Sequence, residues 1–349
     1  MDFTLDETQQ AVADLAAGVL RGEPDDARTR AALASEAGYD ESAWKAMGQA
    51  GLLALTLPES LGGDGCGPAE TGIVLTEVGR HTRPLPALPT LALGVLPVVA
   101  FGDAEQQGVL LPEVADGRVL TAALRDAPGA PVRWVSSGLV GTRVGVPYAA
   151  PAHRILVPTA VGVAVVDPGG RGVSRQRTPT STGAPEYTVT FSGARPETVL
   201  DAGPSDVDRL AVVGAAAVAD GVLAGALRLT ADHVRTRHQF GRPLAAFQAV
   251  AQQIADVYVA ARTVHLAAVS SAWRLGTGRD ADEDLAVTAY WLAAELPKAL
   301  QLCHHLHGGL GVDITYPLHR LYSHAKDLAR LLGGAAYRLD RLGEACSSS

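Results

Sequence analysis

The hydrophobic pattern of this 349-residue sequence changes twice along the chain, and this change limits the possible folds more than any other feature. Between about residues 119 and 199, short β-branched runs alternate with proline and glycine clusters; the clearest runs are 154–157, 161–166 and 186–191. Such runs predict the strands of a small β domain. The segments on either side repeat apolar residues with a helical period. The predicted order is therefore helical, β, helical.

The composition favours helices outside the β segment. Hydrophobic residues make up 47% of the chain but aromatic residues only 5%, so small and aliphatic residues carry the apolar content. Such residues favour close packing between helices. We predict an α+β, mainly α fold with helical domains over 1–117 and 201–349 and a β domain over 118–200. Thr4 is the predicted cap of the first helix, because Glu7 follows three residues later as in a capping box.

The charge and the cysteines exclude several classes of function. A net charge of −8 without a basic stripe argues against a nucleic-acid partner. The N-terminus lacks the pattern of a signal peptide, and the apolar stretch 91–101 is too short to cross a bilayer. Cys66, Cys303 and Cys346 are scattered and odd in number, which argues against a disulfide framework. We therefore expect a cytoplasmic protein with no nucleic-acid partner and no membrane association.

An arginine-rich run is the most informative local feature. It covers residues 235–244, between two predicted long helices, and contains a turn marked by Gly241 and Pro243. Arg237 could hold a phosphate through charge-assisted bonds, and Phe240 could stack on an aromatic ring system. Considered alone, the run fits an ordinary basic helix end equally well.

A second run, at 304–311, combines histidines with glycines. Gly308 and Gly309 follow a predicted helix and would let backbone approach a ligand closely. His304 and His307 lie one helical turn apart, but a metal site needs further ligands and the sequence has no HExxH signature. A helix end with histidines near its last carbonyls is favoured, so no metal is predicted.

Together these motifs resemble those of the acyl-CoA dehydrogenase family over nearly the whole chain. Residues 237–248 resemble its arginine-x-glutamine-phenylalanine-glycine motif, 308–319 its late glycine motif, and 57–65 its early proline-glutamate and double-glycine loop. The resemblance implies a helical domain, a small β domain and a C-terminal four-helix bundle. It also implies an FAD cofactor and an acyl-CoA substrate, with a glutamate removing the α-proton while a hydride passes from Cβ to the flavin.

In this family the late motifs reach across a subunit interface to the neighbour's FAD. The residues that the resemblance assigns to cofactor binding are Arg237, Phe240, Gln248, His305, Gly308 and Gly309. Arg237 would hold the pyrophosphate, and Phe240 and Gln248 would line the adenosine end. The two glycines would allow the cofactor to approach closely. His305 stands where the family often has glutamine.

The base expected from the resemblance is missing. Leu332 stands where many members place it and Ala211 where another branch does, so no catalytic residue is assigned. Arg125 replaces the threonine that usually meets the flavin ring. Asp208 and Asp220 are nearby acids, and Asp220 is expected to be a solvated or capping residue.

This combination is similar to the smaller subunit of heteromeric, α2β2 acyl-CoA dehydrogenases of actinobacterial steroid catabolism, most clearly at 303–309 and 326–334. The resemblance implies a homologous partner with the catalytic glutamate, and an electron-transfer flavoprotein or similar acceptor. The implied substrate is a 3-oxo-pregn-4-ene-20-carboxyl-CoA type thioester, which becomes the 17(20)-ene. Two alternatives stay open: a self-sufficient homo-oligomeric flavoenzyme with Asp208 or Asp220 as base, and a non-enzymatic acyl-CoA-binding scaffold.

Overall fold

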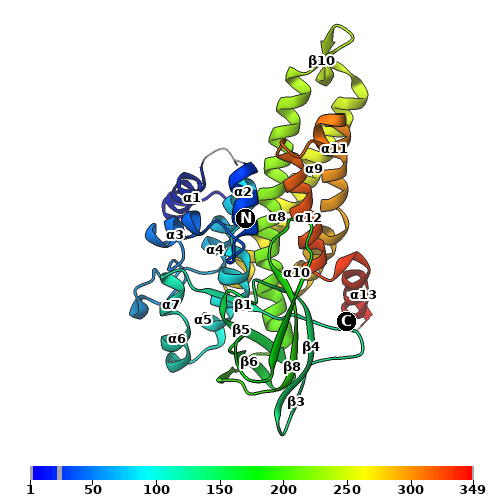
Figure 1. The fold of residues 1–349 in the computed structure, drawn as a ribbon. Helices are drawn as coiled ribbons and strands as arrows, with labels where there is room; N and C mark the ends of the chain where they lie inside the picture. The colour runs from blue at the N-terminus through cyan, green and yellow to red at the C-terminus, as the bar shows by residue number, and fades with distance from the viewer. Residues whose placement is uncertain (1–2, 22–25, 348–349) are drawn as a thin grey trace.

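The computed structural model describes residues 3–21 and 26–347, which form two helical regions with β-sheets between them in sequence (Figure 1). The α+β, mainly α class is confirmed. The first region contains short helices packed around α4. Its elements are α1 (Glu7–Leu20), α2 (Asp26–Ala34), α3 (Glu41–Gln49), η1 (Glu59–Leu61), α4 (Pro68–His81), η2 (Leu88–Val95), α5 (Leu96–Phe101), α6 (Ala104–Leu110) and α7 (Pro112–Ala115).

The first helix begins two residues later than predicted. Asp6, not Thr4, is its cap: the Asp6 carboxylate accepts from the Gln9 amide N–H, and the Gln9 side chain accepts from the Asp6 N–H. This reciprocal pair is a capping box in which Asp replaces Ser or Thr. The prediction placed the box in the wrong register because both pairs have the same spacing.

The middle region holds two sheets that enclose an apolar core. One sheet has the order β1-β5-β6-β9, with β1 and β5 parallel, and the other has the order β2-β4-β8-β7, with β3 paired to β4. The three predicted runs lie in β5, β6 and β8, which confirms them. The strands are β1 (Val119–Ala122), β2 (Arg125–Asp126), β3 (Arg133–Val135), β4 (Gly138–Pro147), β5 (Ala152–Thr159), β6 (Gly162–Val166), β7 (Val173–Thr178), β8 (Glu186–Ala194) and β9 (Thr198–Leu200).

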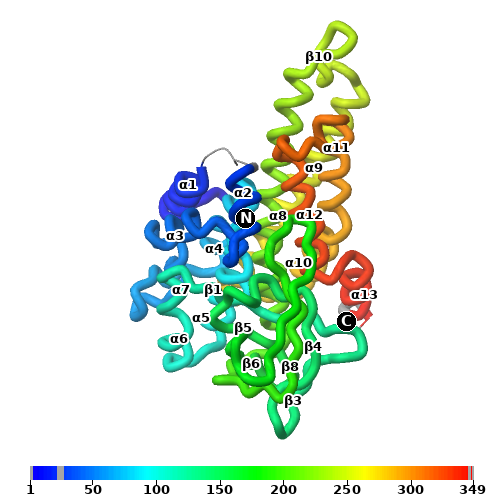
Figure 2. The backbone as a smooth tube through the Cα atoms, viewed as in Figure 1, coloured from blue at the N-terminus to red at the C-terminus, as the bar shows by residue number. Residues whose placement is uncertain are grey.

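The last region is a helical bundle built around α8, whose C-terminal end carries a small hairpin. In Figures 1 and 2 this hairpin, labelled β10, lies at the far tip of the bundle, away from the β-sheets. The elements are α8 (Pro204–Thr236), β10 (His238–Gln239), β11 (Arg242–Pro243), η3 (Leu244–Ala246), α9 (Gln248–Gly276), α10 (Asp282–Ala294), α11 (Leu296–His307), η4 (Gly308–Val312), α12 (Leu318–Leu331) and α13 (Gly334–Ser347).

Helix α8 is the central element of the structure. It is long and apolar enough to cross a membrane, but 89% of its most apolar window is buried inside the protein, as in the core helix of a bundle. It packs against α4 on one side and against α9, α11 and α12 on the others. Both ends of α8 therefore matter for function: one reaches the β-sheets and the other reaches the hairpin.

Candidate functional site

The hairpin at the bundle tip carries the predicted cofactor residues Arg237 and Phe240. Strands β10 and β11 pair through His238 with Pro243 and Gln239 with Arg242, which leaves Phe240 and Gly241 as a two-residue loop. Both loop residues have positive φ, 53° and 76°. Positive φ at both central residues is the requirement of a type I′ hairpin turn, which matches the twist of the two strands.

Phe240 adopts a backbone conformation that aromatic residues rarely accept. A bulky residue at positive φ is an outlier and costs about 1–3 kcal/mol. The side chain is also 91% exposed, and its ring makes an edge contact with Phe247 at 6.2 Å between centroids. The chain thus holds an aromatic ring in solvent at an energetic cost, which indicates a contact with a molecule outside this chain.

Arg237 lies at the base of the same hairpin, directly after α8. Its backbone is fixed, because its N–H donates to the carbonyl of His233 and its carbonyl accepts from the N–H of Leu244, both at 2.8 Å. Its side chain is exposed, and among the described residues it has neither an ion pair nor a hydrogen bond. Arg242, by contrast, lies over the Phe247 ring at 4.0 Å. Arg237 is therefore available for an anion.

The late glycines form an open surface at the end of α11. Gly308 caps this helix with a φ of +58°. A Cβ added at Gly308 or Gly309 would meet no atom of the chain within 4 Å, and Gly309 has no left-handed φ. Packing within the chain therefore does not require glycine at 309. His305 and Gln248, the other predicted cofactor residues, are exposed on the last turn of α11 and the first turn of α9.

A histidine stack brings the two predicted motifs together. The rings of His233, near the end of α8, and His307, at the end of α11, lie 4.4 Å apart and nearly parallel. His307 Nδ1 lies 2.8 Å from the Cys303 carbonyl and Nε2 lies 3.1 Å from the Tyr316 hydroxyl. A carbonyl only accepts, so Nδ1 carries the proton and Nε2 accepts from Tyr316. This link was not predicted, because no local pattern in the sequence relates His233 to His307.

The charge state of the stack follows from its burial. Burial lowers the pKa of His307, and His233 lowers it further, while the Cys303 carbonyl opposes the shift. Burial also lowers the pKa of His233, with a contribution from Arg237. Both rings are therefore neutral near pH 7. Across the described residues, no group of three or more His, Cys, Asp or Glu side chains could hold a metal ion.

A network of two arginines and an aspartate fills the place where the β-sheets meet the bundle. Asp208, on the first turns of α8, accepts two hydrogen bonds from Arg338, at 2.7 and 3.0 Å, and one from Arg125, at 3.0 Å. Arg125 also donates to the Leu331 carbonyl, and Arg338 to the Leu332 carbonyl. The network thus ties β2, α8, α12 and α13 together.

The network keeps Asp208 ionised. Burial on its own would raise the pKa of Asp208, but hydrogen bonds and charge from Arg338 and Arg125 outweigh it and hold the pKa below its usual value. Both carboxylate oxygens are already occupied. A carboxylate with a lowered pKa and no free oxygen is a poor general base. The role of Arg338 was not predicted, because no local pattern in the sequence relates it to Asp208.

Nearby, the two positions considered for a base are buried and apolar. Leu332 and Ala211 are each only 1% exposed. Asp220 is buried and pairs with His265, with 3.0 Å between its Oδ2 and the ring Nδ1. The expectation that Asp220 is a solvated or capping residue is therefore wrong. It lies in the middle of α8, where α4 and α9 cover the helix.

Comparisons with known proteins agree over the full length. Residues 6–118 match the acyl-CoA dehydrogenase N-terminal domain and residues 206–345 the C-terminal domain. Acyl-CoA dehydrogenase FadE28 of Mycobacterium tuberculosis is 48% identical, with 99% of both chains covered. The ChsE4-ChsE5 complex of the same species has a chain that is 32% identical over 100% of both chains, with a TM-score of 0.93. A chain of a Tcur3481-Tcur3483 steroid ACAD variant is 35% identical over 99% of both chains, with a TM-score of 0.90.

These matches confirm the predicted fold and the oxidoreductase class. The family acts on CH–CH bonds of acyl-CoA thioesters, and its cofactor is FAD. On the evidence of both domain matches and of relatives that cover the whole chain, this protein belongs to the acyl-CoA dehydrogenase family.

Proposed function

We propose that this chain is the subunit of a heteromeric, α2β2 acyl-CoA dehydrogenase that completes the FAD site of a homologous partner, which carries the catalytic glutamate. The observation that supports this most strongly is the contrast between the bundle tip and the chain's own centre. At the tip, the Arg237 side chain has no ion pair or hydrogen bond within the described residues, and the Phe240 ring is exposed. At the centre, the two positions where the family places its base hold no titratable group, because they are Leu332 and Ala211.

The tip fits the parts of FAD that the family motifs hold. The unpaired guanidinium of Arg237 suits the pyrophosphate, and the exposed Phe240 ring suits a flat aromatic surface at the adenosine end, beside Gln248. The open faces of Gly308 and Gly309 leave room for the cofactor, next to His305. In this proposal the 201–349 domain serves the partner's cofactor through these residues.

In the same proposal the chain's own centre holds no flavin. Arg125, in the 118–200 domain, stands where the family usually has a threonine against the flavin ring, and here it binds Asp208 instead. Asp208 is held by Arg338 as well, so it cannot replace the missing base. The 1–117 domain packs against the bundle through α4 and α8. We therefore assign one FAD to each pair of subunits.

The proposed reaction introduces a Cα–Cβ double bond into a CoA thioester. When bound, FAD accepts the hydride that leaves Cβ while the partner's glutamate removes the α-proton. We further propose a steroid substrate of the 3-oxo-pregn-4-ene-20-carboxyl-CoA type with its three-carbon C17 side chain, and electron-transfer flavoprotein or a similar acceptor. The similarity to a chain of the Tcur3481-Tcur3483 steroid ACAD supports this class. The scattered cysteines support a cytoplasmic location.

The test is the flavin content of the full chain, purified alone and after co-expression with a homologous acyl-CoA dehydrogenase that has the glutamate. We expect a colourless chain alone and a yellow, active complex with one flavin for each heterodimer. A chain that is yellow and oxidises acyl-CoA on its own would contradict the proposal and favour the self-sufficient enzyme. A complex without flavin would favour the scaffold.

A further inference from the structure

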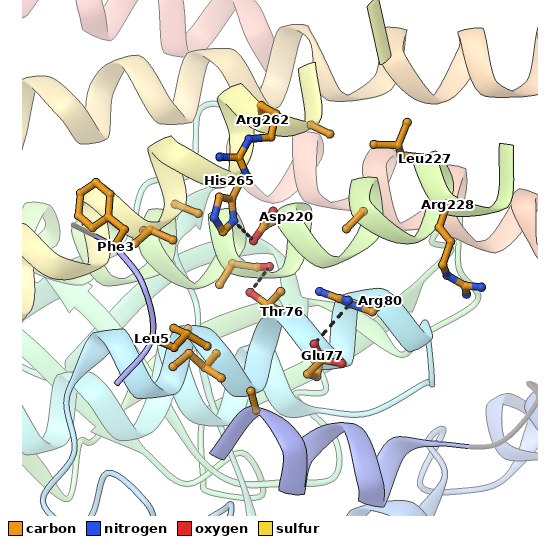
Figure 3. A pocket seen from close by; sticks show the side chains of 18 of the residues that line it. Phe3, Leu5, Thr76, Glu77, Arg80, Asp220, Leu227, Arg228, Arg262 and His265 are labelled. Carbon is orange, nitrogen blue, oxygen red and sulfur yellow. Dashed lines mark hydrogen bonds and ion pairs between the residues drawn. The ribbon is translucent and has the colours of Figure 1, made fainter. Parts of the chain in front are cut away.

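A large cavity of the described structure lies apart from the six predicted cofactor residues and from the arginine–aspartate network. It has a volume of about 1000 Å³ and lies between α4, α8 and α9 (Figure 3). None of the six predicted cofactor residues lines it, and neither do Arg125, Asp208 and Arg338. Its volume is at the upper end of the range for small-molecule sites. The cavity is therefore a candidate for a separate ligand site.

The walls of the cavity are held by a close crossing of α4 and α8. A Cβ at Gly221 would lie 1.8 Å from the Thr76 carbonyl oxygen, and a Cβ at Gly79 would lie 2.2 Å from the Val218 carbonyl oxygen. Only glycine allows the two backbones to approach this closely. Asp220 and Thr76, which line the cavity, lie at this crossing. The cavity is thus bounded by helices that cannot slide to fill it.

One part of the cavity is apolar. Nine of the residues that line it are alanines, among them Ala224 on α8 and Ala261 on α9, so the space is open because side chains stop at Cβ. At one end Phe3 packs edge-on against Trp273, 6.3 Å apart. Figure 3 shows Phe3 and Leu5 on one side of the cavity and Arg80 and Arg228 on the opposite side. This apolar part would accept a hydrocarbon body.

Between the two ends, a buried acid–histidine pair faces the cavity. Asp220 is only 8% exposed, and it accepts from Nδ1 of His265 at 3.0 Å. Nε2 of His265 has no hydrogen-bond partner within the described residues and remains available. Burial raises the pKa of Glu77, which lies beside them on α4; Asp220 adds to this shift and Arg80 opposes it. These groups could bond to a hydroxyl or carbonyl of a ligand.

Positive charge exceeds negative charge along the cavity: Figure 3 shows Arg80 and Arg228 at the end opposite Phe3, and Arg262 beside His265. Four arginines line the cavity, against the two carboxylates of Glu77 and Asp220: Arg80, Arg228, Arg235 and Arg262. Arg80 pairs with Glu77 at 3.3 Å and Arg235 with Asp232 at 3.9 Å. Arg228 and Arg262 have no carboxylate partner within the described part of the chain, and both are exposed. Each of these two guanidinium groups is therefore available to an anionic group.

We propose that this cavity binds an anionic amphiphile, with its hydrocarbon body along the alanine-lined part and its anionic group at Arg228, at the end opposite Phe3. The inference does not depend on the proposed function, because the cavity lining includes none of the six predicted cofactor residues and none of the three network residues. Two sources have this chemistry: a free carboxylic acid with a long apolar body, and the corresponding CoA thioester. The site would be a second ligand site of the chain.

The test uses the full chain, together with its partner where the two co-purify. Dodecanoate, dodecanoyl-CoA and the uncharged 1-dodecanol are titrated, and quenching of Trp273 fluorescence is followed, with Trp273→Phe to identify its share of the signal. We expect an anionic probe to bind at least tenfold more tightly than the alcohol, since one charge-assisted bond contributes about 1.5–3 kcal/mol. The tighter of the two anionic probes identifies the source.

The variants separate this cavity from any other site. Ala224→Phe, on α8, places a ring in the alanine-lined part of the cavity and should abolish binding of the anionic probe. Ala261→Phe, on α9, is the second variant in case the first misfolds. Arg228→Ala should weaken binding about tenfold, whereas Arg195→Ala, an exposed arginine after β8, should change nothing. Equal binding of the alcohol, or unchanged binding in both filled variants, would overturn the proposal.

Discussion

The bundle tip and the junction between the β-sheets and the bundle use their arginines in opposite ways. At the tip, Arg237 is exposed without a partner, beside a Phe240 ring that the backbone holds in solvent at positive φ. At the junction, Arg338 is buried and donates both to Asp208 and to the Leu332 carbonyl, and Arg125 closes the network. The tip leaves the Arg237 guanidinium without a partner within the described residues, whereas at the junction every guanidinium nitrogen of Arg125 and Arg338 donates a hydrogen bond within the chain.

This difference supports the proposal that the tip, and not the junction, meets a ligand. Buried donors that are fully satisfied hold a fold together, and a ligand would have to displace bonds that already exist. Exposed donors and strained aromatic residues contribute nothing to the isolated chain, so the benefit must come from contact with something else. The two regions can therefore be tested separately, since changes at the junction should alter stability and changes at the tip should alter cofactor binding.

The largest effect on stability is expected from Asp208→Ala. Removing this carboxylate leaves Arg338 buried and uncompensated, which should lower the free energy of unfolding by about 3 kcal/mol. Denaturant unfolding measures the loss, with Asp201→Ala, an exposed aspartate just before α8, as the matched control. If both variants lose equally little, the network does not hold the junction together.

The pH dependence of the same network gives a second check. The pKa of Asp208 is lowered in the folded protein, so its stabilising contribution is complete above the unfolded value of 3.8 and is lost as the pH falls through the folded value. The difference in unfolding free energy between wild type and Asp208→Asn should thus be constant near neutral pH and shrink below about pH 5. A difference that grows towards acid pH would contradict the ion-pair assignment.

At the tip, Phe240→Asn should stabilise the chain and harm the complex. Asparagine accepts positive φ much more readily than phenylalanine, so the free energy of unfolding should rise by about 1 kcal/mol. Flavin retention by the complex should fall because the ring is lost. Phe240→Tyr keeps the ring and the strain, and it should leave both quantities near wild type. Loss of stability in Phe240→Asn would show that the ring serves the chain's own packing.

Gly309→Ala should have the smallest effect on stability. The added Cβ meets no atom of the chain, so the unfolding free energy should change by less than about 0.5 kcal/mol. Gly308→Ala, next to it, should cost about 1 kcal/mol or more because of its positive φ. Flavin titration of the complex should nevertheless show weaker binding in both. Unchanged flavin affinity in Gly309→Ala would argue against cofactor contact at this turn.

Local signals in the sequence were enough to predict most of the helices and strands and the turn at the tip. The β-branched run 161–166 predicts β6, and the glycine at 241 marks the hairpin. The long-range pairs could not be predicted in the same way. Asp208 meets Arg338 from 130 residues away. Asp220 was expected in solvent because aspartates seldom lie inside, but the central position of α8 buries it against His265.

The most direct measurement compares the flavin stoichiometry of the co-purified complex for Arg237→Ala and Arg125→Gln. If the tip serves the partner's cofactor, as we propose, Arg237→Ala should lose most of its flavin while remaining assembled. If the centre of this chain holds no flavin, Arg125→Gln should keep one flavin for each heterodimer. Loss of flavin in Arg125→Gln with full retention in Arg237→Ala would show that the chain binds FAD in its own centre.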